Sequence, residues 1–268
     1  YFTAGEVKAD VEAIASKPEP VAVAPEVQEE VVEEALELAI RQAETSQFPW
    51  PPAPIEPILK NRAAGEGLWT TFDPDVVVPT PNAPALFYRT FLRPSSRYKR
   101  RPTHIIAWDP RQLRLEMRAG TREPIPQTPH KGDGRIKRDP ELLADVVAAF
   151  NGGFQTTHTT FGMMVERKLL LYPRRYGATV ALLDDGRPAF GTWNNGKVIP
   201  DEMVSFRQNL QPLVEDRVFN AYRRRRFGGH QNVAGAKEGW TCRSAICYTP
   251  AGVLMYFYTV GIARISQT

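Results

Sequence analysis

The sequence has few of the side chains that most often bind metals. It contains 2 cysteines and 4 histidines in 268 residues, and the histidines are scattered. No paired C-x-x-C spacing is present, so we predict no structural zinc site. Cys242 and Cys247 flank an expected strand, and strand residues five positions apart point to opposite faces. We therefore expect no disulfide between them, and they do not indicate a redox compartment.

Long apolar runs are also absent. No run of about 18 apolar residues is present, so we predict no transmembrane segment in this chain. The start at Tyr1 has neither a basic lead nor an initiator methionine, and we expect an internal or processed fragment. A Ser-His-Asp triad, a Walker loop and a dinucleotide fingerprint all lack the strand, turn and helix context that they need. Those enzyme classes are disfavoured.

Charge is distributed unevenly along the chain. Residues 1–60 carry 12 acidic and 4 basic side chains, a net charge of −8, which leaves +12 for the rest of a chain whose total is +4. A hydrophobic fraction of 42% is sufficient for a folded core. We expect three parts: an acidic helix and proline-rich accessory region at 1–60, an extended proline- and arginine-rich linker or strap at 61–102, and a domain at 103–268.

Short strands separated by turns are predicted from Thr103 onward. Runs of alternating apolar and polar residues on either side of a turn indicate hairpins. The expected pairs are 104–108 with 113–117, the two halves of 163–172, 178–183 with 188–193, and 243–248 with 253–259. An amphipathic acidic helix is expected at 26–43, and a short helix after Pro140. The predicted class is α+β, mainly antiparallel β hairpins with a few helices, an N-terminal acidic helix and a proline-rich strap.

The most informative run is Ala148-Ala149-Phe150-Asn151-Gly152-Gly153-Phe154. An apolar run that leads into Asn-Gly-Gly predicts a buried strand that ends in backbone only glycine tolerates, where ligands commonly meet the main chain. Asn-Gly is also the commonest signal for a tight hairpin turn, and that alternative stays open. A polar cluster follows at 155–160 and contains Thr157 and His158.

Three short motifs, in this order, resemble those of the phosphodiester glycosidase family. They are Ala149-Phe150-Asn151-Gly152-Gly153-Phe154, the hairpin of Gly162 to Lys168, and Arg243-Ser244-Ala245-Ile246. The resemblance covers about residues 103–262. Members of the family continue past the last hairpin into a helix and an Asp-Gly-Gly-rich segment, whereas this sequence stops at Thr268. We therefore expect the domain at 103–268 to be C-terminally incomplete or the copy to be catalytically incomplete.

The resemblance implies hydrolysis or binding of a sugar-1-phosphodiester or a related envelope glycan. Such a reaction needs cations or backbone N–H groups for the anionic leaving group, and a carboxylate near the developing oxocarbenium ion. Asp184 and Asp185 precede Gly186 in an expected turn, so no catalytic carboxylate is identified. The expected catalytic residues are His158 as proton donor and Arg243 as anion holder; the expected substrate-binding residues are Asn151, Gly152, Gly153 and Thr157.

The partners expected from the sequence are anionic. Residues 89–138 hold 14 Lys or Arg against 4 Asp or Glu, and Arg223 to Arg226 form a second basic run. Aromatic residues are not interleaved with these cations, which disfavours nucleic acid. An anionic glycan or sugar-phosphate, and protein partners at the N-terminal helix and the basic patches, fit better. The sequence leaves the cofactor unknown.

Two functions are left open by the sequence. The first is a glycosidase acting on sugar phosphodiesters, and the second is a catalytically inactive structural or binding component of a larger envelope assembly. The family resemblance implies a periplasmic, cell-surface or secreted location for either of them. Whether the chain is an enzyme is not decided by its motifs.

Overall fold

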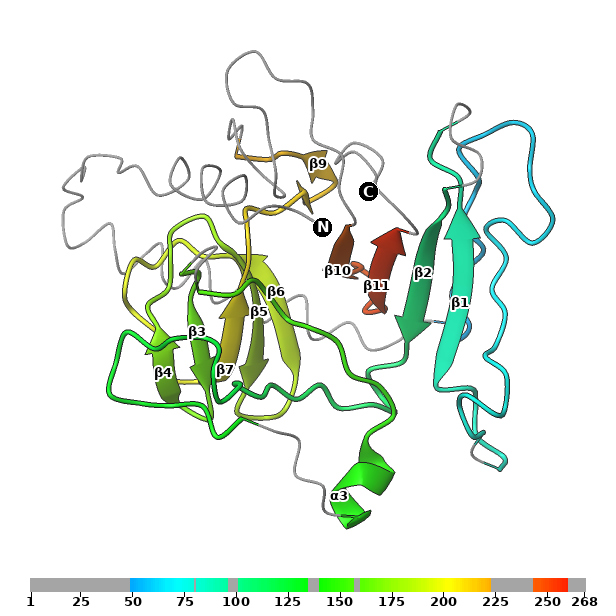
Figure 1. The fold of residues 1–268 in the computed structure, drawn as a ribbon. Helices are drawn as coiled ribbons and strands as arrows, with labels where there is room; N and C mark the ends of the chain where they lie inside the picture. Colours follow the sequence, from blue (N-terminus) through cyan, green and yellow to red (C-terminus); the bar gives the residue numbers. More distant parts are fainter. Residues whose placement is uncertain are drawn as a thin grey trace. The chain divides into compact units, whose positions relative to one another are not determined.

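The computed structural model describes residues 49–79, 81–95, 101–134, 140–156, 160–222 and 243–259. Its backbone forms two compact units. The first unit contains the described residues of Leu115–Gln231, and the second contains those of Glu44–Arg114 and Asn232–Thr268. Each unit has its own antiparallel sheet (Figure 1). The boundaries predicted at residues 60 and 102 stay a prediction.

The predicted α+β class is wrong, because strands dominate the described chain. Across those residues there are eleven strands and a single helix, α3 (Pro140–Asp145), of six residues. The apolar residues at helical spacing after Pro140 cover only a short stretch. Helices below about 12 residues are marginal in water without packing, and this one has six residues. The acidic helix expected at 26–43 lies outside the described residues. None of the described helices is long and apolar enough to cross a membrane.

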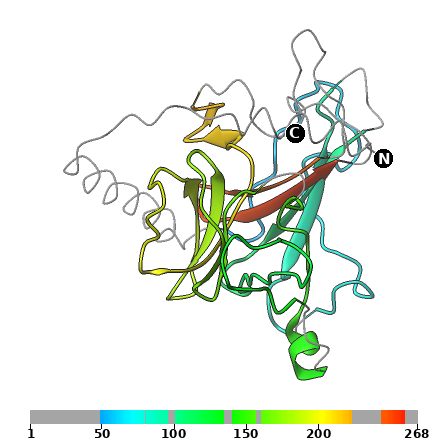
Figure 2. The ribbon, with the colours of Figure 1, turned by 60° about the vertical axis from the view of Figure 1, so that its left-hand side comes forward.

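The sheet of the second unit has four antiparallel strands in the order β1-β2-β11-β10. The strands are β1 (Phe87–Leu92), β2 (Thr103–Trp108), β10 (Ser244–Tyr248) and β11 (Leu254–Thr259). The predicted hairpin of β10 with β11 is confirmed. In both views β11 (red) lies beside β2 (Figures 1 and 2).

The predicted pairing of 104–108 with 113–117 is wrong. β1 and β11 occupy the two edges of β2, so no edge is left for a further strand. Residues 113–117 form no strand, yet their side chains still alternate between half-buried and exposed. The alternation of apolar and polar residues at 113–117 therefore predicted correctly which side chains are half-buried. It predicted the strand pairing incorrectly.

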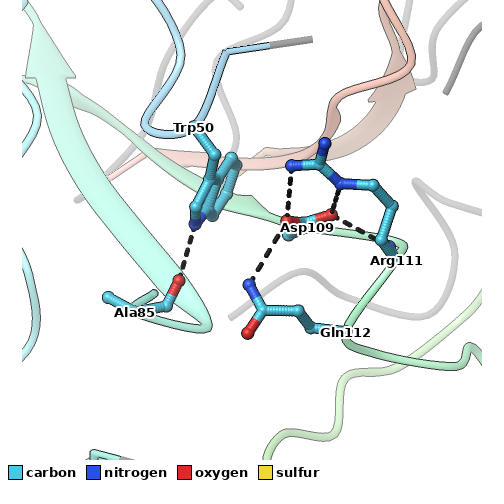
Figure 3. Close-up of polar contacts among 5 residues, drawn as sticks. All are labelled: Trp50, Ala85, Asp109, Arg111 and Gln112. Carbon is cyan, nitrogen blue, oxygen red and sulfur yellow. Dashed lines mark hydrogen bonds and ion pairs between the residues drawn. The ribbon is translucent and has the colours of Figure 1, made fainter. Parts of the chain in front are cut away.

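A small apolar core lies on one face of this sheet. Its buried members are Ile105, Ala107, Val253 and Met255. Trp50, from the proline-rich segment, packs against this core. The Trp50 indole N–H donates to the carbonyl of Ala85 (2.7 Å; Figure 3), so a residue without regular structure is fixed both by burial and by a hydrogen bond.

Cys247 also packs against this core. It is a free thiol, and burial raises its pKa to about 12. A thiol with so high a pKa is almost entirely protonated at neutral pH and is a poor nucleophile. Cys242 lies outside the described residues.

Two buried carboxylates organise the irregular parts of the second unit. Asp109 directly follows β2, and its oxygens accept hydrogen bonds from Arg111 Nε and Nη2 (both 2.8 Å) and from Gln112 Nε2 (3.2 Å; Figure 3). Glu66 accepts hydrogen bonds from the backbone N–H groups of Ala63 (2.9 Å) and Arg93 (2.8 Å). Each carboxylate thus joins a turn to the chain that follows a strand.

The Glu66 carboxylate is also paired with a cation. Arg93 Nη2 lies 2.7 Å from Glu66 Oε2, and Glu66 is 2% exposed. Burial alone would raise the pKa of Glu66, but its hydrogen bonds and the charge of Arg93 outweigh burial and hold this pKa below its ordinary value of 4.5.

The sheet of the first unit has five antiparallel strands in the order β4-β3-β7-β5-β6, with β7 in the middle. The strands are β3 (Met163–Val165), β4 (Lys168–Leu171), β5 (Ala178–Leu183), β6 (Pro188–Thr192) and β7 (Met203–Gln208). A separate small hairpin consists of β8 (Val214–Glu215) and β9 (Val218–Phe219). The predicted hairpins β3–β4 and β5–β6 are confirmed.

Apolar side chains cover both faces of this sheet. On one face a row crosses four strands through the register pairs Met164–Phe206, Phe206–Ala181 and Ala181–Ala189. On the other face Met163, Val165 and Leu171 form a second buried cluster. A sheet that is buried on both faces holds its central strand rigidly, and that strand is β7.

The last residue of β7, Gln208, is fully buried and fully hydrogen bonded. Its Oε1 accepts the backbone N–H groups of Gly162 (3.1 Å) and Arg174 (2.7 Å). Its Nε2 donates to the Arg174 carbonyl (3.2 Å) and to Thr179 Oγ1 (3.1 Å). One amide therefore ties two loops and β5 to the central strand.

We predict that Gln208→Leu destabilises the first unit strongly. Leucine keeps the volume but leaves the Gly162 and Arg174 N–H groups buried without an acceptor, which costs about 3 kcal/mol of unfolding free energy. Urea denaturation at constant m-value measures this loss. Gln155→Leu, at an exposed position, is the control and should change stability by less than about 0.5 kcal/mol. Equal effects of the two substitutions would contradict the structural role of Gln208.

We predict an acid-sensitive contribution from Glu66. Because the pKa of Glu66 is lower in the folded state, its stabilisation is complete above the unfolded pKa and is lost as the pH falls through the folded pKa. The free energy of unfolding should therefore decrease on acidification below about pH 4.5. Glu66→Gln should lower stability by about 2 kcal/mol at pH 7 and make that decrease shallower.

The matched control for Glu66 is Glu56→Gln. The Glu56 side chain is 85% exposed and pairs with Arg62, so its removal should leave the pH dependence unchanged. Urea unfolding from pH 3 to pH 7 compares the three proteins. Parallel pH curves for the wild type and the Glu66 variant would contradict the prediction.

Candidate functional site

The glycine loop, residues 151–156, does not follow a buried strand. Residues 148–150 pair with no strand in the described part of the chain, so the predicted strand is wrong. Phe150 is 42% exposed and Val147 is 44% exposed. An apolar run needs a ladder partner to become a strand, and none is present here among the described strands. The loop itself begins with an Asx turn, in which the Gly153 N–H donates to Asn151 Oδ1 (3.2 Å).

Arg207 of β7 anchors this loop to the sheet. Its Nη2 donates to the carbonyl of Phe154 (3.1 Å), and its Nη1 donates to the carbonyls of Phe161 (2.7 Å) and Gly162 (3.3 Å). One guanidinium thus bridges the glycine loop and the chain that enters β3. Arg207 was not singled out in the sequence.

Glycine is required at position 153 by the approach of that guanidinium. A Cβ on Gly153 would lie 2.4 Å from Arg207 Nη2 and 2.6 Å from Arg207 Nε. A Cβ on Gly152 would meet nothing nearer than Arg207 Cγ at 3.8 Å. The two neighbouring glycines therefore have different functions, and the edge of the guanidinium formed by Nε and Nη2 faces Gly153.

Arg207 is a partly desolvated cation. Burial lowers its pKa to about 10, while the negative charge of Glu123 acts in the opposite direction. With that pKa the guanidinium stays protonated at neutral pH. Hydrogen bonds use three of its five N–H groups within the described chain, and the remaining donors are on Nε and Nη2.

Glu123 brings a carboxylate to the same loop. Its Oε2 accepts hydrogen bonds from the backbone N–H of Thr156 (2.8 Å) and from Thr156 Oγ1 (2.7 Å). The Thr156 hydroxyl oxygen in turn accepts the N–H of Ile125 (2.7 Å). These bonds set the direction of the carboxylate. The glycine loop is thus held at Thr156 by Glu123 and at Phe154 by Arg207.

The segment that carries Glu123 is itself tied to the sheet. The Gln127 N–H donates to the Leu170 carbonyl (2.8 Å), and Thr128 Oγ1 donates to the Leu169 carbonyl. Both acceptors lie in β4. The cation and the carboxylate therefore stand on backbone that the five-stranded sheet positions.

The predicted site residues are distributed over both units. Asn151, Gly152 and Gly153 belong to the first unit, whereas Arg243 belongs to the second. Arg243 is 9% exposed, and its backbone N–H donates to Thr259 Oγ1 (3.0 Å). The two remaining residues of the prediction, Thr157 and His158, lie outside the described residues. Within the first unit, the loop that contains Asn151, Gly152 and Gly153 is contacted by Arg207 and Glu123.

Asp185 has the turn role that the sequence indicated. The backbone N–H of Arg187 donates to Asp185 Oδ1 (2.9 Å) and, together with the Arg187 side chain, lowers the pKa of this carboxyl. Gly186, which follows, has a φ of 82°. Asp185 therefore closes the β5–β6 hairpin. Among the described residues no three His, Cys, Asp or Glu side chains are grouped so that they could hold a metal ion.

Neither Arg207 nor Glu123 has a local sequence signal. An arginine near the end of a strand usually reaches solvent, and only the loop packed over it reveals that its guanidinium is partly buried. Glu123 lies in an irregular segment without periodicity. The useful signal was Gly152-Gly153, which marks a close approach of backbone to another group without saying which group approaches.

The comparisons with known proteins give one distant similarity. No protein-family model matches the sequence, and the search of curated proteins finds no match. A solved structure that is similar is the zebrafish N-acetylglucosamine-1-phosphodiester alpha-N-acetylglucosaminidase catalytic domain, auto-inhibited by its pro-peptide. The TM-score is 0.39 at 14% sequence identity, over 70% of this chain and 67% of that one. The function proposed below depends on the side chains of this chain.

We predict that Gly153→Ala and Gly152→Ala differ sharply. The first places a methyl group against the guanidinium of Arg207 and should cost about 1–3 kcal/mol of unfolding free energy. The second has room and should stay within about 1 kcal/mol of the wild type. Urea denaturation of both variants measures the difference. Two equal losses would show that Arg207 does not pack on Gly153.

Proposed function

We propose that this chain binds a sugar-1-phosphodiester, or a related anionic envelope glycan, at the glycine loop, and that it hydrolyses the bond between the sugar and the phosphate. The observation that carries the proposal is the convergence of a partly desolvated arginine and a carboxylate on one glycine-containing loop. The resemblance of the sequence motifs to phosphodiester glycosidases supports the same substrate class. A periplasmic, cell-surface or secreted location is part of this proposal.

The chemistry of the substrate matches these groups. A phosphodiester carries a negative charge, and its departure from a sugar places further charge on the leaving oxygen. The guanidinium of Arg207 is suited to a phosphate oxygen, because it binds such groups through charge-assisted N–H donors. Gly152 and Gly153 allow the backbone to come close to the same anion. The partial desolvation of Arg207 strengthens this attraction.

The other predicted residues keep their proposed functions. His158 is proposed as the proton donor, and Asn151 and Thr157 as hydrogen-bonding partners of the sugar or the phosphate. Arg243 belongs to the second unit, and its function as an anion holder stays a prediction from the sequence. Partners of the whole protein would then be anionic glycans, with protein contacts at the segment 26–43, where the sequence predicts a helix, and at the basic runs of the sequence.

We predict that Arg207→Met weakens binding of a phosphodiester probe at least tenfold. The probes are the methyl phosphodiesters of glucose-1-phosphate and of N-acetylglucosamine-1-phosphate, and isothermal titration calorimetry measures their affinity. Arg207→Lys keeps the charge without the planar guanidinium and should have an intermediate affinity. Arg187→Met removes an arginine at a turn whose side chain is 40% exposed and serves as the control.

The outcomes separate the two functions left open by the sequence. Wild-type release of reducing sugar and methyl phosphate supports the glycosidase, and binding without release supports an inactive binding component. Thermal unfolding of each variant distinguishes lost affinity from lost folding. Unchanged affinity in a folded Arg207→Met protein would remove the glycine loop as the anion site. Unchanged turnover in Asn151→Ala or Arg243→Ala would remove that residue from the site.

A further inference from the structure

A hydrolase of the proposed kind needs a carboxylate beside the bond that breaks. The sequence offered only Asp184 and Asp185, and Asp185 is engaged in closing a hairpin turn. In the first unit, Glu123 is the carboxylate whose charge acts on Arg207. This places a carboxylate near the group proposed to hold the phosphate.

The contacts of Glu123 give its carboxylate a fixed direction. Both hydrogen bonds from Thr156 end on the same oxygen, Oε2, at 2.8 and 2.7 Å. The residue is half-buried rather than enclosed in a core, and Thr156 belongs to the glycine loop. A carboxylate held in one direction at the edge of a loop can receive a proton from a reactant of defined position.

We propose that Glu123 is the general base of this site, an inference that rests on the proposed function. Water attacks the anomeric carbon and forms a new C–O bond, while the bond from that carbon to the phosphate oxygen breaks. The electron pair of the broken bond leaves on the phosphate oxygen, beside Arg207. The proton of the water passes to the Glu123 carboxylate and from there to solvent. The products are a free sugar and a phosphate monoester.

Glutamine at position 123 separates catalysis from structure. The amide oxygen of glutamine can accept both hydrogen bonds from Thr156, so the loop keeps its anchor. The amide cannot accept a proton from water at neutral pH. A purely structural Glu123 therefore predicts near-normal activity for Glu123→Gln, whereas a general base predicts its loss.

The experiment measures turnover of the same methyl phosphodiesters by the full chain. We expect Glu123→Gln to lower kcat by about 10²–10⁴-fold and to leave KM and the affinity of the probe within threefold of the wild type. The matched control is Glu116→Gln, which removes an exposed carboxylate paired with Arg118 and should retain wild-type kcat. Thermal unfolding checks that both variants are folded.

Each outcome decides between the two proposals. Turnover by a folded Glu123→Gln protein at the wild-type rate overturns the role of Glu123 and leaves the proposed function standing. Loss of probe affinity together with kcat would make Glu123 a structural support of the loop and also overturns its role as base. A wild-type chain that binds the probe without hydrolysing it overturns the catalytic role while the binding function stands. A wild-type chain that does neither overturns both.

Discussion

The amide of Gln208 is the interaction on which the first unit depends. It is buried at the end of the central strand, and all of its hydrogen bonds go to loops or to the neighbouring strand β5. Successive residues of a strand point to opposite faces, so Arg207 points to the face opposite Gln208. The amide fixes the end of β7 from one side, and this fixes where the guanidinium stands on the other. The geometry of the candidate site therefore depends on Gln208, a residue that lies outside the site.

In the second unit, charged side chains hold the irregular parts of the chain in place. Most of its chain outside the sheet is irregular, and buried backbone N–H groups in irregular chain need acceptors. Glu66 and Asp109 supply them, each with an arginine that balances its charge. A carboxylate that is removed from water is stable only with such partners. In both units, side chains provide the hydrogen bonds that helices would otherwise satisfy within themselves.

Hairpins were predictable from the sequence because their information is local. The β5–β6 pair has alternating strands around Asp-Asp-Gly, the β10–β11 pair turns at Pro-Ala-Gly, and the β3–β4 strands are joined by Glu-Arg. Strand order was not predictable, because the placement of β7 between β3 and β5 depends on contacts between distant residues. The strand expected at 148–150 failed for the same reason. Its composition is that of a strand, but no described strand lies beside it to complete a ladder.

The partial burial of Arg207 links the fold to the proposed chemistry. Removing a guanidinium from water is unfavourable unless dipoles or opposite charges replace the lost hydration. Three carbonyls and the charge of Glu123 do so. This compensation keeps the cation protonated at neutral pH, and the three carbonyls carry only partial charges. A cation that is compensated but not neutralised keeps an attraction for a further anion, and the lack of a Cβ on Gly153 lets backbone approach it closely.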